Sequence, residues 1–390
     1  MTNHDVIIIG AGAAGLMCAI AAGRRGRRVL LMDHAAEPGA KILISGGGRC
    51  NFTNLGSGPE NFFSDNPAFC RSALTRFSPR DFLAMVDAHH IGFHEKAPGQ
   101  LFCDGSARAI LAMLRNECAA AGVRFAFAHQ VSDIARADRF IISTDHGPFS
   151  AESLVLATGG LSIPKLGATG FSHEWARRFG LGLTEIAPAL VPLTLDGADL
   201  ELARPLAGVS LACTASIGRT RFADDMLFTH RGLSGPAILQ ISTAWRTGPI
   251  LLDLLPGTNA ADLLLDRKRA RPRTQLAASL AELLPTRLAN ALAPHPAGTA
   301  RLADLPDREL RALAARLNRW GPIPAGTEGF AKAEVTRGGV DTRDLSSRSM
   351  MARDVPGLFV IGEAVDVTGW LGGHNFQWAW SSGWAAGSFA

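Results

Sequence analysis

A glycine-rich turn between two hydrophobic runs constrains the fold of this chain more than any other feature. Residues 5–9 (DVIII) are typical of a strand buried on both faces, and Gly10-Ala-Gly12-Ala-Ala-Gly15 follows directly. Residues 16–24 have a helical composition, and a second apolar run at 29–32 ends at Asp33. This order of strand, glycine turn, helix, strand and acid is typical of a βαβ unit that binds a dinucleotide.

Each of the three glycines in the turn has a physical task. Gly10 permits the tight turn, Gly12 lets the backbone approach a pyrophosphate, and Gly15 allows the helix to pack closely on the strand. The free amides of the first helical turn then face the phosphates. Asp33 lies 23 residues beyond Gly10 and can accept hydrogen bonds from both ribose hydroxyls, while its charge disfavours NADP.

FAD and NAD share this half-site, and three further segments favour FAD. The loop 41–51 contains three successive glycines between polar groups, which suits a flat ligand. Residues 157–160 end a strand in a glycine pair. Residues 361–366 end another strand with Glu363, which could bond a ribityl chain, and the chain continues through 372–376 into a helix. We expect the positive end of that helix to stabilise negative charge on a reduced flavin.

Composition narrows the class of protein. The chain has 390 residues, 47% of them hydrophobic and 19% charged, which excludes global disorder and suggests two or three domains. There is no Tyr, so chemistry that needs a phenol is excluded. The six Cys form no C-x-x-C pair, which speaks against metal sites and disulfides. The chain contains neither a long apolar run nor a basic signal-peptide start, so we expect a cytoplasmic protein with no membrane partner.

The order of the predicted elements indicates an α/β protein with an interrupted nucleotide-binding domain. We predict a discontinuous FAD-binding domain over 1–187 and 332–390, a β-rich insert over 188–257 and a helical insert over 258–331. The strands of the β-rich insert have no helices predicted between them. The further strands expected are 123–131, 140–144, 154–157, 191–195, 209–217, 250–254 and 357–361, with helices around 310–317 and from about 376.

Six segments of the chain resemble the BaiN/RdsA family of NAD(P)/FAD-dependent oxidoreductases, which also contains flavoproteins described as aminoacetone oxidases. The resemblance covers nearly the whole chain and implies non-covalent FAD in a Rossmann-like domain of glutathione-reductase type, interrupted by a β-barrel-like domain and a small helical domain. The segments are the turn at 10–15, KILISGGGRCNFTN at 41–54, LVLATGG at 154–160, LFTHRGLSGPAILQIS at 227–242, EVTRGGV at 334–340 and GEAVDVTGWLGGHNFQ at 362–377.

The resemblance also implies which residues bind the cofactor, position by position. The adenosine and pyrophosphate part would meet Gly10, Gly12, Ala13, Gly15, Asp33 and the backbone of Val131. The flavin and its phosphates would lie along Lys41, Ser45, Gly46, Gly47, Arg49, Asn51, Ala157, Thr158 and Gly159. The ribityl chain and the flavin edge would meet Gly362, Glu363, Gly373, His374, Asn375 and Phe376. The family often has Tyr where this chain has Ile163 and His374, which weakens any transfer of substrate identity.

Several residues allow both a functional and a structural interpretation. His374 could donate a proton beside the flavin, or only its backbone could matter. Cys50 could be a redox thiol or link the flavin covalently, although packing of a small residue is favoured. His230 and Arg231 could face a substrate or lie in a solvated turn, and Arg337 could neutralise a phosphate or an acidic substrate.

The dense basic run at 267–273 could bind nucleic acid, but a solvated helix end is the favoured interpretation because no aromatic residues are interleaved with it. The mild net charge of +4 does not indicate a nucleic-acid binder either.

The function predicted from these features is that of an FAD-dependent oxidoreductase. Hydride would pass between the flavin N5 and a small organic substrate in a cleft between the FAD domain and the insert. Because the chain has a single dinucleotide fingerprint, NAD(P)H would act as a transient reductant in the substrate cleft, unless O₂ is the electron acceptor. The alternatives are a flavin-containing accessory protein acting on RNA and a non-catalytic protein that keeps FAD for stability. The catalytic side chains and the oligomeric state stay unassigned.

Overall fold

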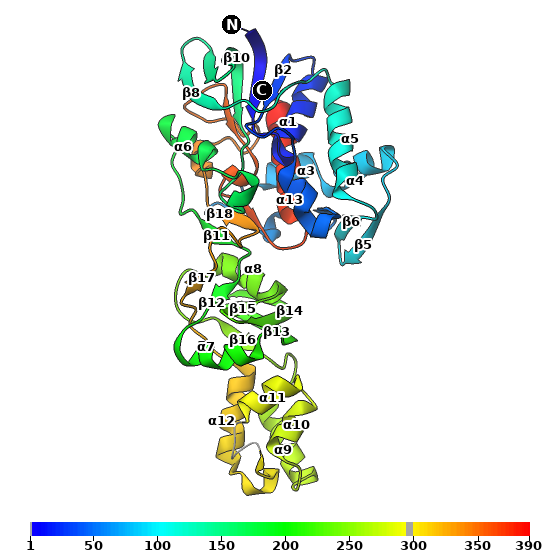
Figure 1. The fold of residues 1–390 in the computed structure, drawn as a ribbon, viewed down its shortest axis with the longest axis vertical. Helices are drawn as coiled ribbons and strands as arrows, with labels where there is room; N and C mark the ends of the chain where they lie inside the picture. The colour runs from blue at the N-terminus through cyan, green and yellow to red at the C-terminus, as the bar shows by residue number, and fades with distance from the viewer. Residues whose placement is uncertain (1, 294–298) are drawn as a thin grey trace. The chain divides into compact units, whose positions relative to one another are not determined.

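The computed structural model describes residues 2–293 and 299–390, and it divides into two compact units (Figure 1). Unit 1 comprises Met1–Pro188 and Glu334–Ala390, and unit 2 comprises Ala189–Ala333. The further division of the insert into a β-rich and a helical domain at 257/258 stays a prediction.

Unit 1 is an α/β structure with one seven-stranded sheet and additional small sheets. Its helices are α1 (Ala13–Arg24), α2 (Ala40–Ile44), α3 (Arg71–Arg76), α4 (Pro79–Ala88), α5 (Ala107–Ala120), α6 (Phe171–Arg178) and α13 (His374–Gly387). Its strands are β1 (Thr2–Ile9), β2 (Val29–Met32), β3 (Asn51–Asn54), β4 (Phe62–Phe63), β5 (Phe93–Ala97), β6 (Gln100–Cys103), β7 (Arg124–Ala126), β8 (Val131–Arg136), β9 (Phe140–Thr144), β10 (Gly147–Leu156), β18 (Val335–Arg337), β19 (Leu358–Val360) and β20 (Thr368–Gly369); β11 (Ala187–Ala189) spans the boundary with unit 2.

The central sheet has the order β7-β2-β1-β10-β9-β8, and β19 also pairs with β10. The pairs from β7 to β10 and the pair β10–β19 are parallel, whereas β9 and β8 are antiparallel. In the parallel part Ile9 is in register with Met32 and with Leu156, and Leu156 is in register with Val360. The carboxyl ends of these strands therefore meet at one edge of the sheet, where ligands bind in open α/β sheets.

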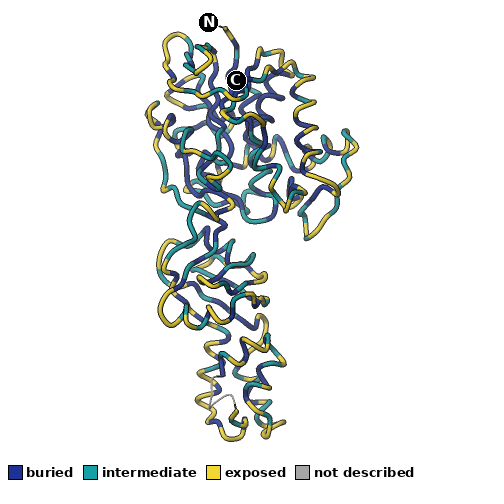
Figure 2. Tube along the Cα trace, viewed as in Figure 1, coloured by how far each residue is buried: buried dark blue, intermediate teal, exposed yellow. Residues whose placement is uncertain are grey.

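Helices α1 and α13, from opposite ends of the chain, lie side by side (Figure 1). A Cβ atom on Gly383 would lie 2.3 Å from the Ala14 carbonyl oxygen, and one on Gly387 would lie 2.4 Å from that of Cys18. These glycines therefore let the two backbones approach closely, and α13 begins at His374 rather than at the expected residue 376. Buried residues follow both helices and the central strands (Figure 2).

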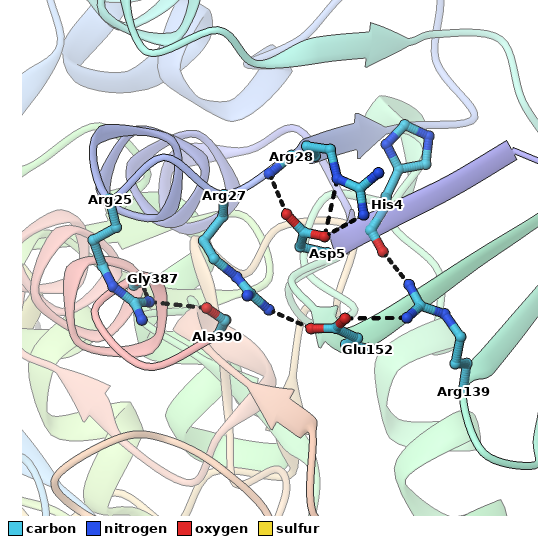
Figure 3. Close-up of polar contacts among 9 residues, drawn as sticks. All are labelled: His4, Asp5, Arg25, Arg27, Arg28, Arg139, Glu152, Gly387 and Ala390. Atoms are coloured by element: carbon cyan, nitrogen blue, oxygen red, sulfur yellow. Dashed lines mark hydrogen bonds and ion pairs between the residues drawn. The ribbon is translucent and has the colours of Figure 1, made fainter.

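Arginine side chains form ion pairs and hydrogen bonds at the end of the sheet far from the glycine turn (Figure 3). Arg28 pairs with Asp5 at 2.6 Å, and this bond holds the pKa of the carboxyl down to about 2. Glu152 lies between Arg27 at 2.9 Å and Arg139 at 3.1 Å. Arg25 donates at 2.9 Å to the carbonyls of Gly387 and Ala390, where a cation complements the carboxyl end of α13.

Unit 2 contains an antiparallel sheet in the order β16-β13-β14-β15-β12-β17. The segment that leads into β17 closes this sheet, because Trp320 exchanges backbone hydrogen bonds with Leu252 of β16 at 2.8 and 3.0 Å, and Ala325 donates to Thr194 of β12 at 2.8 Å. The sheet is therefore barrel-like, as predicted. Its strands are β12 (Leu193–Thr194), β13 (Ser210–Ile217), β14 (Thr220–Thr229), β15 (Gly232–Ser234), β16 (Leu251–Asp253) and β17 (Gly326–Thr327). Its helices are α7 (Gly197–Ala203), α8 (Pro236–Ala244), α9 (Ala260–Ala270), α10 (Leu276–Ala281), α11 (Thr286–Leu292) and α12 (Asp307–Asn318).

Two predictions of secondary structure are wrong. Helices α7 and α8 lie between the strands of the insert, where none was expected. Helix α8 begins with Pro236 at its first position and buries Ile238 and Ile241 on one face, a short pattern that also resembles a strand. The expected strand at 123–131 is interrupted, since β7 ends at Ala126 and β8 begins at Val131, because left-handed Ala128 breaks the strand.

Candidate functional site

The glycine turn lies at the carboxyl edge of the parallel strands in unit 1. A Cβ atom on Gly10 (φ +110°) would lie 2.5 Å from the Ala157 carbonyl oxygen, and one on Gly15 would lie 1.9 Å from that of Gly10. A Cβ atom on Gly12, in contrast, would meet no atom within 4 Å. Gly12 is the N-cap of α1 and has no side chain to cap the free amides of the first turn, so Ala13 and its neighbours leave donors for an anion.

Asp33 holds the segments on either side of the turn. Its Oδ2 accepts from the Ala11 amide at 2.7 Å and its Oδ1 from the Ala35 amide at 2.9 Å. The His129 amide donates to the Asp33 carbonyl at 3.0 Å, two residues before Val131. A carboxylate has about four acceptor positions, so Asp33 still has positions that could accept hydrogen bonds from ribose hydroxyls, the role predicted for it.

A partly buried polar network joins the loop 41–51 to the strand end at 361–366. Lys41 pairs with Glu363 at 2.7 Å and donates to the Ser162 hydroxyl at 2.6 Å. Glu363 Oε1 accepts from Ser162 at 2.9 Å and from the Thr336 amide at 2.9 Å. Burial favours the neutral acid, but the charge of Lys41 and these hydrogen bonds outweigh it and keep the pKa of Glu363 below its usual value.

Reasoning from the sequence missed Ser162 and Thr336 as members of this network. Thr336 also accepts from the Leu161 amide at 2.8 Å, and a Cβ atom on Gly160 would lie 2.3 Å from its Oγ1. Both residues lie in segments that carry sequence signals, Thr336 in EVTRGGV and Ser162 two residues after the glycine pair. The strand end itself is fixed by Thr158, whose hydroxyl bonds that of Ser172 at 2.7 Å.

The loop 45–51 has an unusual backbone. Gly46, Gly47 and Gly48 have φ values of +56°, +66° and +86°, a left-handed run that disfavours other residues. A Cβ atom on Gly47 would meet no atom within 4 Å, whereas one on Gly46 would lie 2.8 Å from the Phe102 ring. The Ser45 hydroxyl donates to the Ile42 carbonyl at 2.8 Å, and Arg49 is exposed beside the loop.

The same loop leads to the amino end of α13. A Cβ atom on Gly373 would lie 2.6 Å from the Thr53 carbonyl and 2.8 Å from the Asn51 side chain. The Asn375 amide group accepts from the Gly369 amide at 2.8 Å and donates to the Gly369 carbonyl at 2.9 Å, which fixes the turn before the helix. Residues 41–51 therefore run from Glu363 to Gly373, and Phe376 follows in α13, stacked on Trp380.

His374 is buried and faces away from water. Its Nδ1 lies 2.7 Å from the Ser57 hydroxyl, and its ring meets Phe62 edge-on. Burial lowers the pKa of His374 to about 4, so the imidazole is neutral at physiological pH. These contacts favour a structural role over that of a proton donor.

The other ambiguous residues have structural partners or lie in exposed turns. Burial raises the pKa of the Cys50 thiol to about 12, which removes the thiolate that a covalent link or redox role needs. Arg337 is buried and pairs with Glu185 at 3.0 Å. His230 and Arg231 are exposed in the turn between β14 and β15, as expected of a solvated turn.

These features fit FAD. Gly12 and Gly47 leave room that a side chain would fill, and the first turn of α1 offers free amides to a pyrophosphate. Among residues 2–293 and 299–390, no group of three or more His, Cys, Asp or Glu residues could hold a metal ion. In the same part of the chain, no helix has the length and apolar character needed to cross a membrane.

Comparison with known proteins agrees with this geometry. The model of the HI0933-like protein Rossmann domain matches residues 4–389. The chain is 49% identical to a ribosomal RNA dihydrouridine synthase of Escherichia coli, over 99% of this chain and 97% of that protein. It is 30% identical to a 3-dehydro-bile acid delta(4,6)-reductase of Clostridium scindens, over 98% of each chain.

Among solved structures, a 3-ketosteroid-delta4-(5alpha)-dehydrogenase of Rhodococcus jostii has a similar fold, with a TM-score of 0.50 and 15% identity over 99% of this chain and 97% of that one. The specific resemblance to aminoacetone oxidases stays a prediction. The chain belongs to the HI0933-like family, whose members are FAD-dependent oxidoreductases with a Rossmann-type fold.

Proposed function

We propose that this protein is an FAD-dependent reductase that converts uridine in ribosomal RNA into dihydrouridine. The observation that carries the proposal is the 49% identity to a ribosomal RNA dihydrouridine synthase, which extends over 99% of the chain. This proposal departs from all three interpretations of the sequence, because the substrate is a macromolecule and the protein acts on it as an enzyme.

The two relatives have names that describe one type of chemistry. The C5=C6 double bond of uracil is conjugated with the C4 carbonyl, and the name of the bile-acid reductase denotes double bonds beside a ketone. Reduction of such a bond places a hydride on the carbon remote from the carbonyl and a proton on the adjacent carbon. For uridine these two carbons are C6 and C5. NAD(P)H would be the reductant that supplies the hydride, with its electron pair, and this hydride stays in the product.

The residues of unit 1 would hold and orient the cofactor. Bound FAD supplies hydride transfer through its isoalloxazine ring. The amides around Gly12 and the Asp33 carboxylate would bind its dinucleotide part. The Lys41–Glu363 pair would position hydroxyls of the ribityl chain, and the amino end of α13 favours negative charge beside Gly373.

Conversion of an unmodified ribosomal RNA transcript tests the proposal. The full chain, loaded with FAD, is incubated with the transcript and either NADH or NADPH, and the RNA is digested to nucleosides for mass spectrometry. We expect a nucleoside with two hydrogens more than uridine to form only with protein, FAD and reductant together. A 3-keto bile acid with conjugated double bonds serves as the competing substrate.

The proposal fails if the loaded protein reduces the bile acid and leaves every uridine unchanged. That result would assign the protein to reduction of small conjugated ketones, the small-substrate interpretation of its sequence. It fails as well if neither substrate is reduced while the flavin is readily reduced by NAD(P)H.

A further inference from the structure

The basic run at 267–273 is largely neutralised within unit 2. Glu282 pairs with Arg267 at 3.2 Å and with Arg271 at 2.8 Å. Lys268 pairs with Asp307 at 2.8 Å, and Arg269 pairs with Asp266 at 3.0 Å. These cations hold α9, α10 and α12 together, so the run is a poor surface for a polyanion, as the sequence already suggested.

Helix α12 presents a different set of cations. Arg308, Arg311, Arg316 and Arg319, at its carboxyl cap, are all exposed. Within residues 2–293 and 299–390, none of the four side chains forms a hydrogen bond or an ion pair. The helix contains two acids, and Asp307 is already paired with Lys268, which leaves Glu309.

Three of the arginines, Arg308, Arg311 and Arg316, share one face of α12. At about 100° per residue they fall within an arc of about 140° and span about 12 Å along the axis. Arg319 follows at the carboxyl cap, where the backbone is no longer helical. The opposite face is buried through Leu310, Ala314 and Leu317. Asn318 fixes the carboxyl end of the helix, because its side chain donates to Asp253 at 2.9 Å and accepts from the Ala260 amide at 2.9 Å. These bonds fix the carboxyl end of the helix that carries the arginines.

The net positive charge of the chain is concentrated in unit 2, the unit that contains α12. Unit 1 contains 22 basic and 22 acidic residues, whereas unit 2 contains 17 basic and 13 acidic residues. The formal charge of +4 therefore lies wholly in unit 2. A row of unpaired guanidinium groups along one helix of a basic unit is suited to a row of phosphates.

We propose that the α12 arginine face, defined as Arg308, Arg311, Arg316 and Arg319, binds the phosphate backbone of the RNA substrate. This inference rests on the proposed function, which makes RNA the substrate. The face contains no aromatic residue, so it contributes affinity and orientation without reading bases. A membrane surface fits less well, because the exposed large hydrophobic residues of the described chain, Ile44, Leu55, Ile323 and Phe389, all lie outside α12.

Equilibrium binding of the FAD-loaded full chain to the ribosomal RNA transcript, measured at several salt concentrations, tests this proposal. In the variant R308Q/R311Q/R316Q/R319Q we expect the affinity to fall on the order of 100-fold near physiological salt. The negative slope of log K against log salt should become shallower by about 3, because four phosphate contacts are lost. Gln has a helix propensity similar to Arg, so the fold should be retained, as circular dichroism can verify.

The matched control is R71Q/R80Q/R108Q/R115Q in α3, α4 and α5. These arginines are also exposed and form no ion pair with the described residues, and the variant loses the same charge. The proposal predicts that the control binds RNA within about threefold of the unmodified protein. It is overturned if both variants lose affinity equally, or if the α12 variant binds as the unmodified protein does. Equal binding of the unmodified protein to anionic phospholipid vesicles and to RNA, lost in the α12 variant, would overturn it in favour of a membrane.

Dihydrouridine formation separates this proposal from the proposed function. If the unmodified protein makes dihydrouridine while the α12 variant retains full RNA affinity, the binding face is wrong and the function stands. If the unmodified protein makes none, yet its salt-dependent RNA binding is lost only in the α12 variant, the face stands and the function is wrong.

Discussion

Gly12 and Gly15 lie three residues apart in one turn, yet a methyl group would meet very different surroundings at the two positions. At Gly15 it would lie 1.9 Å from the Gly10 carbonyl oxygen, inside the packing between α1 and β1. At Gly12 it would enter open space beside the first turn of α1. These surroundings agree with the tasks expected from the sequence, since Gly15 is needed for the packing of α1 on β1 and Gly12 leaves space for a ligand.

The same division extends to the other glycines of unit 1. Gly383 resembles Gly15, since its Cβ atom would lie 2.3 Å from the Ala14 carbonyl, and Gly47 resembles Gly12. Stability and cofactor binding should therefore respond to different glycines. The predictions below test that separation.

Gly15→Ala should have the largest effect. The added methyl group collides with backbone that cannot move without separating α1 from β1, so we expect a loss of stability on the order of 3–5 kcal/mol or failure to fold. Urea unfolding of the apo protein measures it. A variant with native stability would show that the turn has room for a side chain at this position, which would contradict the proposed difference between Gly15 and Gly12.

Gly12→Ala should leave the apo protein within about 1 kcal/mol of the parent, because the methyl group meets no protein atom and only the helix cap is altered. FAD affinity should fall on the order of 100-fold, since the methyl group occupies the approach of the pyrophosphate. Titration of apo protein with FAD, followed by flavin fluorescence, measures the affinity. Unchanged FAD affinity would contradict the assignment of this turn.

Gly47→Ala should give an intermediate result. Its φ of +66° costs an alanine about 1–2 kcal/mol, although no atom lies within 4 Å of the new methyl group. We expect a modest loss of apo stability together with weaker FAD binding. Gly26→Ala is the matched control, because Gly26 also has a left-handed φ (+80°) and open surroundings but lies in the turn after α1. The control should lose stability and retain FAD affinity, and equal FAD loss in both would contradict the role of the loop.

Glu363→Gln should have the smallest effect, and it should depend on pH. The folded pKa of Glu363 lies below its unfolded value of about 4.3, so its stabilisation is present above that value and is lost as pH falls through the folded pKa. The side chains of Lys41 and Glu363 are 33% and 19% exposed, which limits the stabilisation to about 1 kcal/mol. Unfolding from about pH 7 to about pH 3 should show the difference between parent and variant shrink on acidification. A constant difference would mean that Glu363 is not charged in the folded protein.

The sequence predicted the local part of this fold well. The βαβ unit predicted over 5–33 and the strands predicted at 154–157 and 357–361 are confirmed as β1-α1-β2, the end of β10 and β19, because buried parallel strands and a glycine turn leave a strong local pattern. The packing of Gly383 and Gly387 on α1 could not be predicted, since it joins residues more than 300 positions apart. Helices α7 and α8 have seven and nine residues, which is too short for a clear helical period in the sequence.

The candidate site was predictable where it consists of backbone and less so where it consists of side-chain networks. Glycine spacing marked Gly10, Gly12 and Gly47 without any knowledge of tertiary contacts. Ser162 and Thr336 carry no special spacing, and only the fold brings them to Glu363. The basic run at 267–273 is dense in the sequence, whereas the arginines of α12 are spread over 308–319, and only the helical period separates them from the apolar face.

The most direct test of the proposed chemistry is a single turnover without added reductant. The FAD-loaded protein is photoreduced under anaerobic conditions and mixed with excess unmodified ribosomal RNA transcript, and flavin absorbance and dihydrouridine are measured together. We predict that the oxidised absorbance returns and that one dihydrouridine forms for each flavin reoxidised. A flavin that stays reduced, or one that is reoxidised without any dihydrouridine in the RNA, would contradict the account.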